Sequence, residues 1–310
     1  IQEAQMSKIL VMGHKNPDTD SICSAIAYAN LKKELGFEVE AVRLGTISKE
    51  TQFILDYLNM DAPRLIESVN SGDQIILVDH NEAGQSVDGR DNATILEIID
   101  HHKIDLKTSD PINLRFETVG CSSTIISKIY EEKGVAITKE MATVMLSAIM
   151  SDTLIFKSPT CTEEDVKQGK KLAEISGLDY EVYGKDLLIA GTSLDDKTAY
   201  EIVNIDCKPF EFGTQKAAVA QVNTVEISAV LARKEELETV MKELMAKDGL
   251  DFVTLMITDI ITNSTELYVV GDKTLTIKTF GMSEGAETVF LPNVVSRKKQ
   301  IVPPYTDMAK

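Results

Sequence analysis

Short apolar runs alternate with longer amphipathic stretches from the start of the chain to about residue 190. This alternation is typical of a parallel sheet with helices on its faces. Strands are predicted at 8–13, 38–45, 73–79, 93–100 and 114–120. Helices are predicted at 20–36, 48–58, 122–133, 138–153 and 162–176. Gly36 and Gly177 stand at the ends of two of these helices, where glycine commonly terminates a helix.

A different pattern follows the turn-rich segment 189–197. A strand is predicted at 216–223 and a long charged helix at 227–247. Two further strands, 252–260 and 264–272, are separated by a short polar turn, which favours antiparallel pairing and a mixed sheet.

The chain is therefore predicted to be an α/β protein with two domains, as its length of 310 residues also suggests. The N-terminal domain (1–188) should contain a mainly parallel sheet flanked by helices. A hinge or linker (189–196) should lead to a smaller C-terminal α/β domain (197–310) with a mixed sheet.

The composition is that of a globular protein, with 43% hydrophobic and 26% charged residues. No apolar run is long enough to span a membrane, and the first eight residues lack the hydrophobic region of a signal peptide. Met6 is the expected native start, with residues 1–5 as a leader or remnant. The four cysteines lie far apart and form no CxxC motif. This usage favours reduced thiols and a cytoplasmic protein.

The formal net charge is −17, and the chain has no tryptophan. Such an acidic surface repels nucleic acids and anionic membranes, so neither is an expected partner. A polyanionic substrate would need a local basic site or bound cations.

The four histidines all precede residue 103, and all follow apolar runs that are predicted as strands. The polar residues at these strand ends are His14, Asp18 and Asp20, then Asp79 and His80, then Asp100, His101 and His102. Because ligands bind where the carboxyl ends of parallel strands converge, these side chains are expected at one edge of the sheet.

Crowded carboxylates repel one another unless cations lie between them. Imidazole and carboxylate donors without thiolates suit Mn²⁺, Co²⁺, Mg²⁺ or Zn²⁺. The number of donors exceeds the needs of one structural ion, so a two-metal site with a bridging aspartate is expected.

Each residue also has a simpler interpretation. Asp18 and Asp20 could be turn and helix-capping residues, and Asp79 and Asp100 could merely end their strands. The coincidence of three such clusters, which hold every histidine, favours the metal site. Asp152 follows an apolar helical stretch, and its spacing alone predicts a cap or a surface position.

The segment Ser296-Arg297-Lys298-Lys299 is the only run of three consecutive basic residues in the chain. It could be a solvated turn. Alternatively, arginine and lysine together form a typical phosphate clamp.

These motifs together resemble one known family. They are GHKNPDTDS (13–21), VDHNE (78–82), DHH (100–102), SDT (151–153) and SRKKQ (296–300). The set is similar to that of the family II, manganese-dependent inorganic pyrophosphatases, which belong to the Asp-His-His phosphoesterase superfamily. The resemblance extends from about Lys8 to about Pro304, and other branches of the superfamily lack the C-terminal SRKK motif.

The resemblance implies six metal ligands: His14 and Asp18 on one ion, Asp20, His101 and Asp152 on the other, and Asp79 on both. It implies four substrate-binding and catalytic residues: His102, Lys208, Arg297 and Lys298. Relatives often have a glutamine directly after VDHNE, whereas this chain reads AGQS (83–86), which leaves the role of Gln85 open. His80 has no ligand role in the family, and Asp100 is expected to orient an imidazole.

The implied reaction is hydrolysis of inorganic pyrophosphate to two phosphates by a metal-activated hydroxide, in a two-metal site at the domain interface. Two Mn²⁺ ions per subunit are expected, with Co²⁺ or Mg²⁺ as substitutes and additional Mg²⁺ arriving with the substrate. Closure about residues 189–196 would assemble the site, and a homodimer would form through the N-terminal domain.

Other functions are possible for the same first domain. An exopolyphosphatase would need the same metals and a longer basic groove. An oligonucleotide phosphodiesterase is disfavoured because no histidine follows His102 and the chain is acidic. A regulatory metal-binding module without turnover is disfavoured by the complete ligand set.

Overall fold

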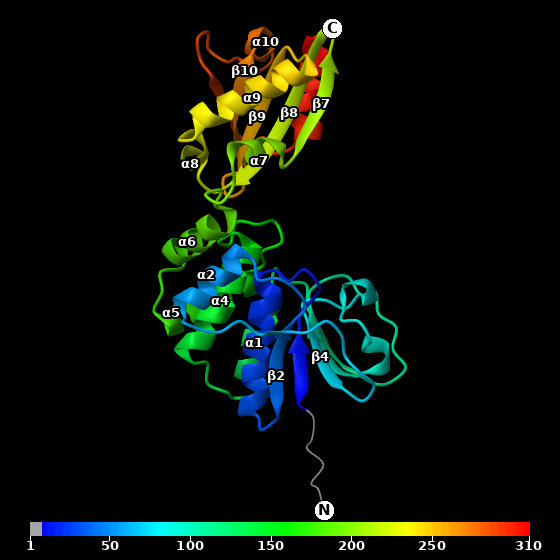
Figure 1. The fold of residues 1–310 in the computed structure, drawn as a ribbon. Helices are drawn as coiled ribbons and strands as arrows, with labels where there is room; N and C mark the ends of the chain where they lie inside the picture. Colours follow the sequence, from blue (N-terminus) through cyan, green and yellow to red (C-terminus); the bar gives the residue numbers. More distant parts are fainter. Residues whose placement is uncertain (1–7) are drawn as a thin grey trace, which may run out of the picture. The chain divides into compact units, whose positions relative to one another are not determined.

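The computed structural model describes residues 8–310, which form two compact units. Residues 8–191 form the first unit and residues 192–310 the second (Figure 1). Residues 189–192 of the predicted linker belong to helix α6 (Tyr180–Thr192). In the described part of the chain, no helix combines the length and the apolar character that crossing a membrane requires. The expected start at Met6 lies outside the described residues.

The first unit contains a six-stranded sheet in the order β3-β2-β1-β4-β5-β6, and every neighbouring pair is parallel. The strands are β1 (Ile9–Met12), β2 (Val39–Arg43), β3 (Arg64–Leu65), β4 (Gln74–Val78), β5 (Thr94–Asp100) and β6 (Asn113–Phe116). The parallel sheet confirms the predicted fold class. β3 was not predicted, because two residues are too few for a periodic pattern. The order reverses between β1 and β4, which therefore flank a topological switch point.

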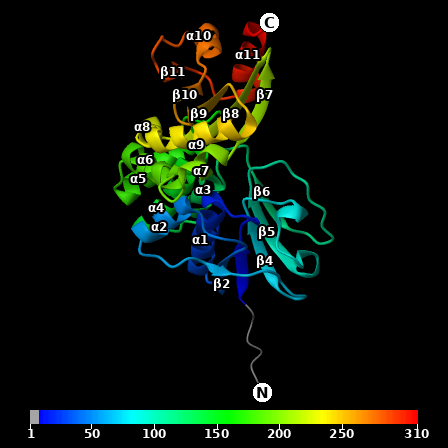
Figure 2. The ribbon, with the colours of Figure 1, turned by 45° about the horizontal axis from the view of Figure 1, so that its top comes forward.

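Five helices of the first unit match the predicted ones, and α6 follows them. They are α1 (Thr19–Glu34), α2 (Lys49–Tyr57), α3 (Ser122–Glu132), α4 (Lys139–Thr153) and α5 (Glu163–Ser176). Helix α1 packs on β1, β2 and β4, and α2, α3 and α4 pack on α1. Two short 3₁₀ turns, η1 (Ala83–Gln85) and η2 (Arg90–Asn92), lie between β4 and β5. Figure 2 shows β4, β5 and β6 beside this group of helices.

Asp165, in the first turn of α5, connects three segments of the first unit. Its carboxylate accepts hydrogen bonds from the Thr162 N–H (2.7 Å), the Gly120 N–H (2.8 Å) and the Thr124 hydroxyl (2.7 Å). Thr162 and Asp165 form a capping box, and Asp165 is fully buried. The residue therefore fixes the start of α5 to the loop that leads into α3.

Replacing Asp165 by alanine is expected to lower the free energy of unfolding by about 3 kcal/mol, because a helix cap is lost and buried donors lose their acceptor. Urea unfolding followed by circular dichroism would measure this change. Glu163→Ala, an exposed substitution in the same helical turn, should change the free energy by about 0.5 kcal/mol or less. Equal stability of the two variants would contradict the anchoring role.

The second unit contains a five-stranded sheet in the order β11-β10-β9-β8-β7. The strands are β7 (Cys207–Phe212), β8 (Gln215–Thr224), β9 (Phe252–Asp259), β10 (Ser264–Gly271) and β11 (Thr288–Leu291). Only β8 and β9 pair in parallel, so the predicted mixed sheet is confirmed. β7 and β11 were not predicted. Pro209 interrupts the pattern of β7, which is compatible with the position of β7 at the sheet edge.

The single charged helix predicted at 227–247 is wrong, because the structure contains α8 (Ile227–Leu231) and α9 (Lys234–Asp248). The break falls at Arg233, whose guanidinium donates to the backbone carbonyls of Leu194 and Lys197, both at 2.8 Å. The remaining helices are α7 (Ala199–Asn204), α10 (Thr274–Phe280) and α11 (Val302–Met308). A π-helical turn, Arg297–Ile301, precedes α11.

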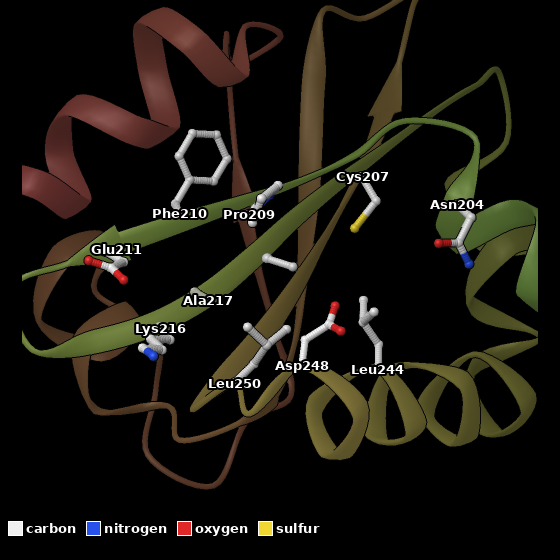
Figure 3. A pocket seen from close by; sticks show the side chains of 11 residues that line it. Asn204, Cys207, Pro209, Phe210, Glu211, Lys216, Ala217, Leu244, Asp248 and Leu250 are labelled. Carbon is white, nitrogen blue, oxygen red and sulfur yellow. The ribbon is translucent and has the colours of Figure 1, made fainter.

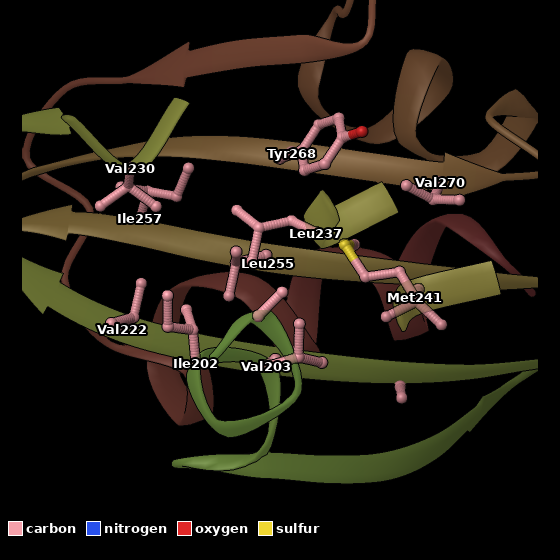
Figure 4. Packing of buried hydrophobic residues seen from close by; sticks show 14 residues of the cluster. Ile202, Val203, Val222, Val230, Leu237, Met241, Leu255, Ile257, Tyr268 and Val270 are labelled. Atoms are coloured by element: carbon pink, nitrogen blue, oxygen red, sulfur yellow. The ribbon is translucent and has the colours of Figure 1, made fainter. Parts of the chain in front are cut away.

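Two hydrophobic clusters form the core of the second unit. In one of them, Ile202 of α7 and Leu237 and Met241 of α9 pack on Leu255 of β9 (Figure 4). The other contains Tyr305 of α11. A cavity of about 540 Å³ opens beside β7, between that strand and the end of α9 (Figure 3).

Candidate metal centre

The first group of donors surrounds the end of β1. His14 Nε2 lies 3.5 Å from Asp18 Oδ1 and 3.4 Å from Asp79 Oδ2. The three side chains offer ligand atoms within 4.8 Å of one another. Asp18 also caps α1, since its Oδ1 accepts the Ser21 N–H at 2.9 Å. The alternative interpretation of Asp18 as a capping residue is thus confirmed, and the cap uses only one of its carboxylate oxygens, whereas Asp20 lies within α1 and is not its cap.

The second group comprises Asp20, His101 and Asp152, which also offer ligand atoms within 4.8 Å of one another. His101 Nε2 lies 3.9 Å from Asp20 Oδ2 and 3.2 Å from Asp79 Oδ1. The two oxygens of Asp79 therefore approach one imidazole from each group. The spacing of Asp152 alone predicted a cap or a surface position. The structure instead places this residue in the cluster with Asp20 and His101.

Asp79 is held in an unusual backbone conformation. It directly follows β4, is 2% exposed and has a φ of 61°. Aspartate tolerates this left-handed region better than most residues, because its short side chain can bond locally. The Asp79 N–H donates to the Ile99 carbonyl at 2.9 Å. This bond fixes the residue between the ends of β4 and β5.

The start of α3 anchors Asp20. The Ser122 N–H donates to Asp20 Oδ2 at 2.7 Å, and the Ser123 N–H donates to Oδ1 at 3.1 Å. The Ser24 and Ser123 hydroxyls also donate to Oδ1. Sequence reasoning did not find this anchor, although Ser122 and Ser123 open a helix whose first N–H groups need acceptors.

The imidazoles of His14 and His101 are oriented by the backbone. His14 Nδ1 lies 2.7 Å from the Lys15 carbonyl, and His101 Nδ1 lies 2.8 Å from the Val119 carbonyl. A carbonyl can only accept a hydrogen bond, so each Nδ1 carries the proton. Each Nε2 therefore faces the carboxylates, as a metal ligand must.

The last residues of the DHH motif have different surroundings. Asp100 is fully buried, and its Oδ1 lies 2.7 Å from His102 Nδ1. The Asn81 amide donates to Asp100 Oδ2 at 2.7 Å.

His80 and Gln85, whose roles the sequence left open, lie after β4. His80 is buried, its Nδ1 bonds the Val78 carbonyl, and its Nε2 has no hydrogen-bond partner among the described residues. Gln85 is exposed, and its backbone carbonyl accepts a hydrogen bond from the Lys15 backbone N–H.

The carboxylates of the cluster perturb one another. Burial and the neighbouring Asp20 raise the pKa of Asp79, and burial with Asp20 and Asp79 raises the pKa of Asp152. Burial also opposes ionisation of Asp20, but His101 and several hydrogen bonds lower its pKa to about 2. Burial disfavours the charged imidazoles, yet Asp18 and Asp79 raise the pKa of His14, and Asp79 and Asp20 raise that of His101. The site therefore attracts positive charge.

The donor set fits hard or intermediate divalent cations, which prefer carboxylate and imidazole ligands. Cys121 also lies in the site, where its thiol donates to Asp20 Oδ1 at 3.1 Å. Burial and the nearby carboxylates raise the pKa of this thiol well above its usual value, so without a bound cation it stays protonated.

The three basic residues implied for substrate binding lie in the second unit. The Arg297 guanidinium is largely buried and donates to Asp206 Oδ1 (2.7 Å) and to the Val219 carbonyl (3.0 Å). Val219 stands opposite Lys208 in the pairing of β7 with β8. Arg297 is thus brought to the strand that carries Lys208. Lys208 and Lys298 are exposed, and neither forms an ion pair within residues 8–310.

Comparisons with known proteins agree with this organisation. Residues 8–149 match the family model of the DHH family N-terminal domain, and residues 185–308 match that of the DHHA2 domain. The chain is 51% identical over 308 residues to a "Probable manganese-dependent inorganic pyrophosphatase" of Bacillus licheniformis, with 98% of this chain and 100% of the relative covered. A protein of Exiguobacterium sp. with the same description is 52% identical, with 98% and 99% covered.

A solved structure is also similar. The "putative family II inorganic pyrophosphatase" of Methanococcus jannaschii has 39% sequence identity and a TM-score of 0.62, with 97% of this chain and 99% of that chain covered. The two family models, the curated relatives and this structure agree over nearly the whole length. The chain therefore belongs to the manganese-dependent, family II inorganic pyrophosphatases of the DHH family.

Proposed function

We propose that this protein hydrolyses inorganic pyrophosphate to two phosphates with the help of two divalent metal ions. The observation that carries the proposal is the pair of donor groups, both of which Asp79 approaches: its Oδ2 lies 3.4 Å from His14 Nε2, and its Oδ1 lies 3.2 Å from His101 Nε2. Two ions held by a common carboxylate can bind both the attacking and the leaving oxygens of a phosphoryl transfer. The names of the relatives support pyrophosphate as the substrate and manganese as the metal.

We assign His14 and Asp18 to one Mn²⁺ and Asp20, His101 and Asp152 to the other, with Asp79 on both. The Nε2 orientation of the two imidazoles and the distances within each group support this assignment. When bound, the two ions would lower the pKa of a nearby water and polarise the phosphoryl oxygens. Two ions per subunit, and Co²⁺ or Mg²⁺ as substitutes, remain predictions.

The protein groups have separate tasks in this mechanism. Asp100 accepts a hydrogen bond from His102 Nδ1, so the other ring nitrogen is available for a substrate phosphate. Lys208, Arg297 and Lys298 would offset the charge that develops on the phosphoryl oxygens and on the leaving phosphate. Additional Mg²⁺ would accompany the substrate. The expected position of this site at the domain interface also remains a prediction.

We also propose that the protein is a cytoplasmic homodimer that associates through its first unit. The four cysteines are free, as expected in a reducing compartment. β6 is an edge strand of the first sheet, with Leu114 on it 49% exposed, and Ile104 in the preceding loop is 61% exposed. Unpaired edge strands with apolar side chains commonly associate.

A substrate comparison tests the proposed reaction. The purified protein with Mn²⁺ should release phosphate from pyrophosphate much faster than from tripolyphosphate or a dinucleotide, and chelation of the metal should stop the reaction. Phosphate release would be measured for each substrate with Mn²⁺ and with Mg²⁺ alone. Equal or greater activity on tripolyphosphate would favour an exopolyphosphatase, and inactivity on pyrophosphate with Mn²⁺ would refute the proposal.

A further inference from the structure

Glu50 of α2 lies behind the metal centre and has no role in the mechanism described above. One of its oxygens, Oε1, accepts hydrogen bonds from two hydroxyl groups, those of Thr19 (2.5 Å) and Ser151. Thr19 is buried at the start of α1, and Ser151 belongs to the last turn of α4. A single atom of Glu50 therefore joins two helix ends that are far apart in the sequence.

Both of these hydroxyl-bearing residues are direct neighbours of proposed metal ligands. Thr19 stands between Asp18 and Asp20, and Ser151 immediately precedes Asp152. The bonds to Glu50 therefore hold the backbone of both ligand-bearing segments at a fixed separation.

Glu50 is itself fixed at the start of α2. Ser48 caps this helix by accepting the Thr51 N–H, and its hydroxyl donates to the Thr51 hydroxyl at 3.0 Å. The Thr51 hydroxyl in turn lies 3.2 Å from that of Thr19. This chain of hydroxyl groups gives the Glu50 carboxylate a defined position, which a flexible surface glutamate would not have.

The end of α6 packs directly on Glu50. A Cβ atom added at Gly191 would lie only 2.9 Å from Glu50 Cβ and 2.9 Å from Glu50 Oε2. Carbon atoms do not approach so closely, so only glycine allows this contact. Gly191 is the last residue of the first unit, from which the chain continues into the second.

We propose that Glu50 is a positioning residue for the metal centre, which sets the separation of the Asp18–Asp20 segment from Asp152. Because α6 rests on the same side chain, the spacing of these ligands also depends on where the end of α6 lies. The inference rests on one part of the proposed function, the binding of Mn²⁺ by the cluster, and does not depend on the reaction. It adds a contact through which the segment leading to the second unit acts on that centre.

Three variants test the positioning role by equilibrium Mn²⁺ binding without substrate, with unbound Mn²⁺ measured by electron paramagnetic resonance. Glu50→Ala removes the shared acceptor and should weaken Mn²⁺ binding about 10-fold or more, the effect typical of residues that orient metal ligands. Glu50→Gln keeps an oxygen acceptor and should restore the affinity to within about 3-fold of the wild type. Glu97→Ala is the matched control, because Glu97 accepts from the Tyr28 hydroxyl and pairs with Lys32 in the second half of α1, whereas Asp18 and Asp20 stand at the start of that helix. It should leave the affinity unchanged.

Wild-type affinity in Glu50→Ala would overturn the proposal. So would an equal loss in Glu50→Gln, which would indicate an effect of charge and not of position. Gly191→Ala should shift Glu50 and weaken Mn²⁺ binding in the same direction, and an unchanged affinity there would refute the connection to α6. Hydrolysis of pyrophosphate by the wild type is measured separately. A wild type that binds Mn²⁺ but hydrolyses nothing would refute the proposed reaction alone, whereas one that binds no Mn²⁺ would refute both.

Discussion

Asp79→Asn is expected to abolish tight binding of the second Mn²⁺ and to lower pyrophosphate turnover about 1,000-fold or more. Among the carboxylates of residues 8–310, only that of Asp79 approaches imidazoles from both donor groups, so its charge would serve both ions. Asparagine has nearly the same shape and also tolerates the left-handed backbone found here (φ 61°). The substitution therefore removes the charge and leaves the turn after β4 intact, whereas alanine would change both.

Binding stoichiometry by isothermal titration calorimetry and initial rates of phosphate release would measure these effects. Asp61→Asn provides a control, because Asp61 is exposed and lies in the loop between α2 and β3, in none of the donor groups. It should bind and hydrolyse as the wild type does. If Asp79→Asn still bound two Mn²⁺ ions with wild-type affinity, the bridging assignment would be wrong.

Arg297→Ala is expected to lower kcat/KM for pyrophosphate about 100-fold to 1,000-fold, the loss typical of a group that stabilises developing charge. It should also destabilise the second unit by about 1–3 kcal/mol, because the Val219 carbonyl and Asp206 lose their buried donor. Steady-state kinetics and urea unfolding would measure the two effects. Lys299→Ala, in the same turn, removes an exposed charge and should change kcat/KM by less than about 3-fold.

The two roles of Arg297 can be separated through its partner. Asp206→Asn weakens the ion pair but keeps the guanidinium, so it should lower stability and preserve most of the activity. A variant Arg297→Ala with wild-type kcat/KM would show that this arginine only supports the fold. Activity lost equally in Asp206→Asn would indicate that the phosphate clamp depends on the ion pair.

The central strands of the first unit could be predicted because β4 carries a continuous apolar run and is buried beyond its first residue, and because β5 is apolar except at Glu97 and its two ends and becomes buried toward its carboxyl end. Short edge strands could not. β3 has only two residues, which is too short for a recognisable pattern. In β7, Pro209 interrupts the sequence pattern that would predict a strand. The break between α8 and α9 also escaped prediction, because the bonds of Arg233 to distant carbonyls have no local sequence pattern.

The location of the candidate site followed from the sequence because parallel strands bring their ends together, and every histidine lies near such an end. Asp152 was assigned to the site only through the resemblance. It lies in the last turn of α4, and the rule that parallel strands bring their carboxyl ends together does not say where the end of a helix lies. Asp20 is anchored by the backbone N–H groups of Ser122 and Ser123. Almost every residue has such a group, so the sequence does not indicate which ones bind Asp20. The burial of Arg297 likewise depends on Asp206, which lies far away in the sequence.

The three buried or half-buried carboxylates at the end of the sheet have a further consequence for the life of this protein. Without cations, Asp20, Asp79 and Asp152 disfavour ionisation of one another, so the fold carries an internal destabilising element. Ligands that bind only the folded chain shift it toward the native state. The manganese supply of the cell would therefore help to determine how much of this protein survives proteolysis, as well as how much of it is active.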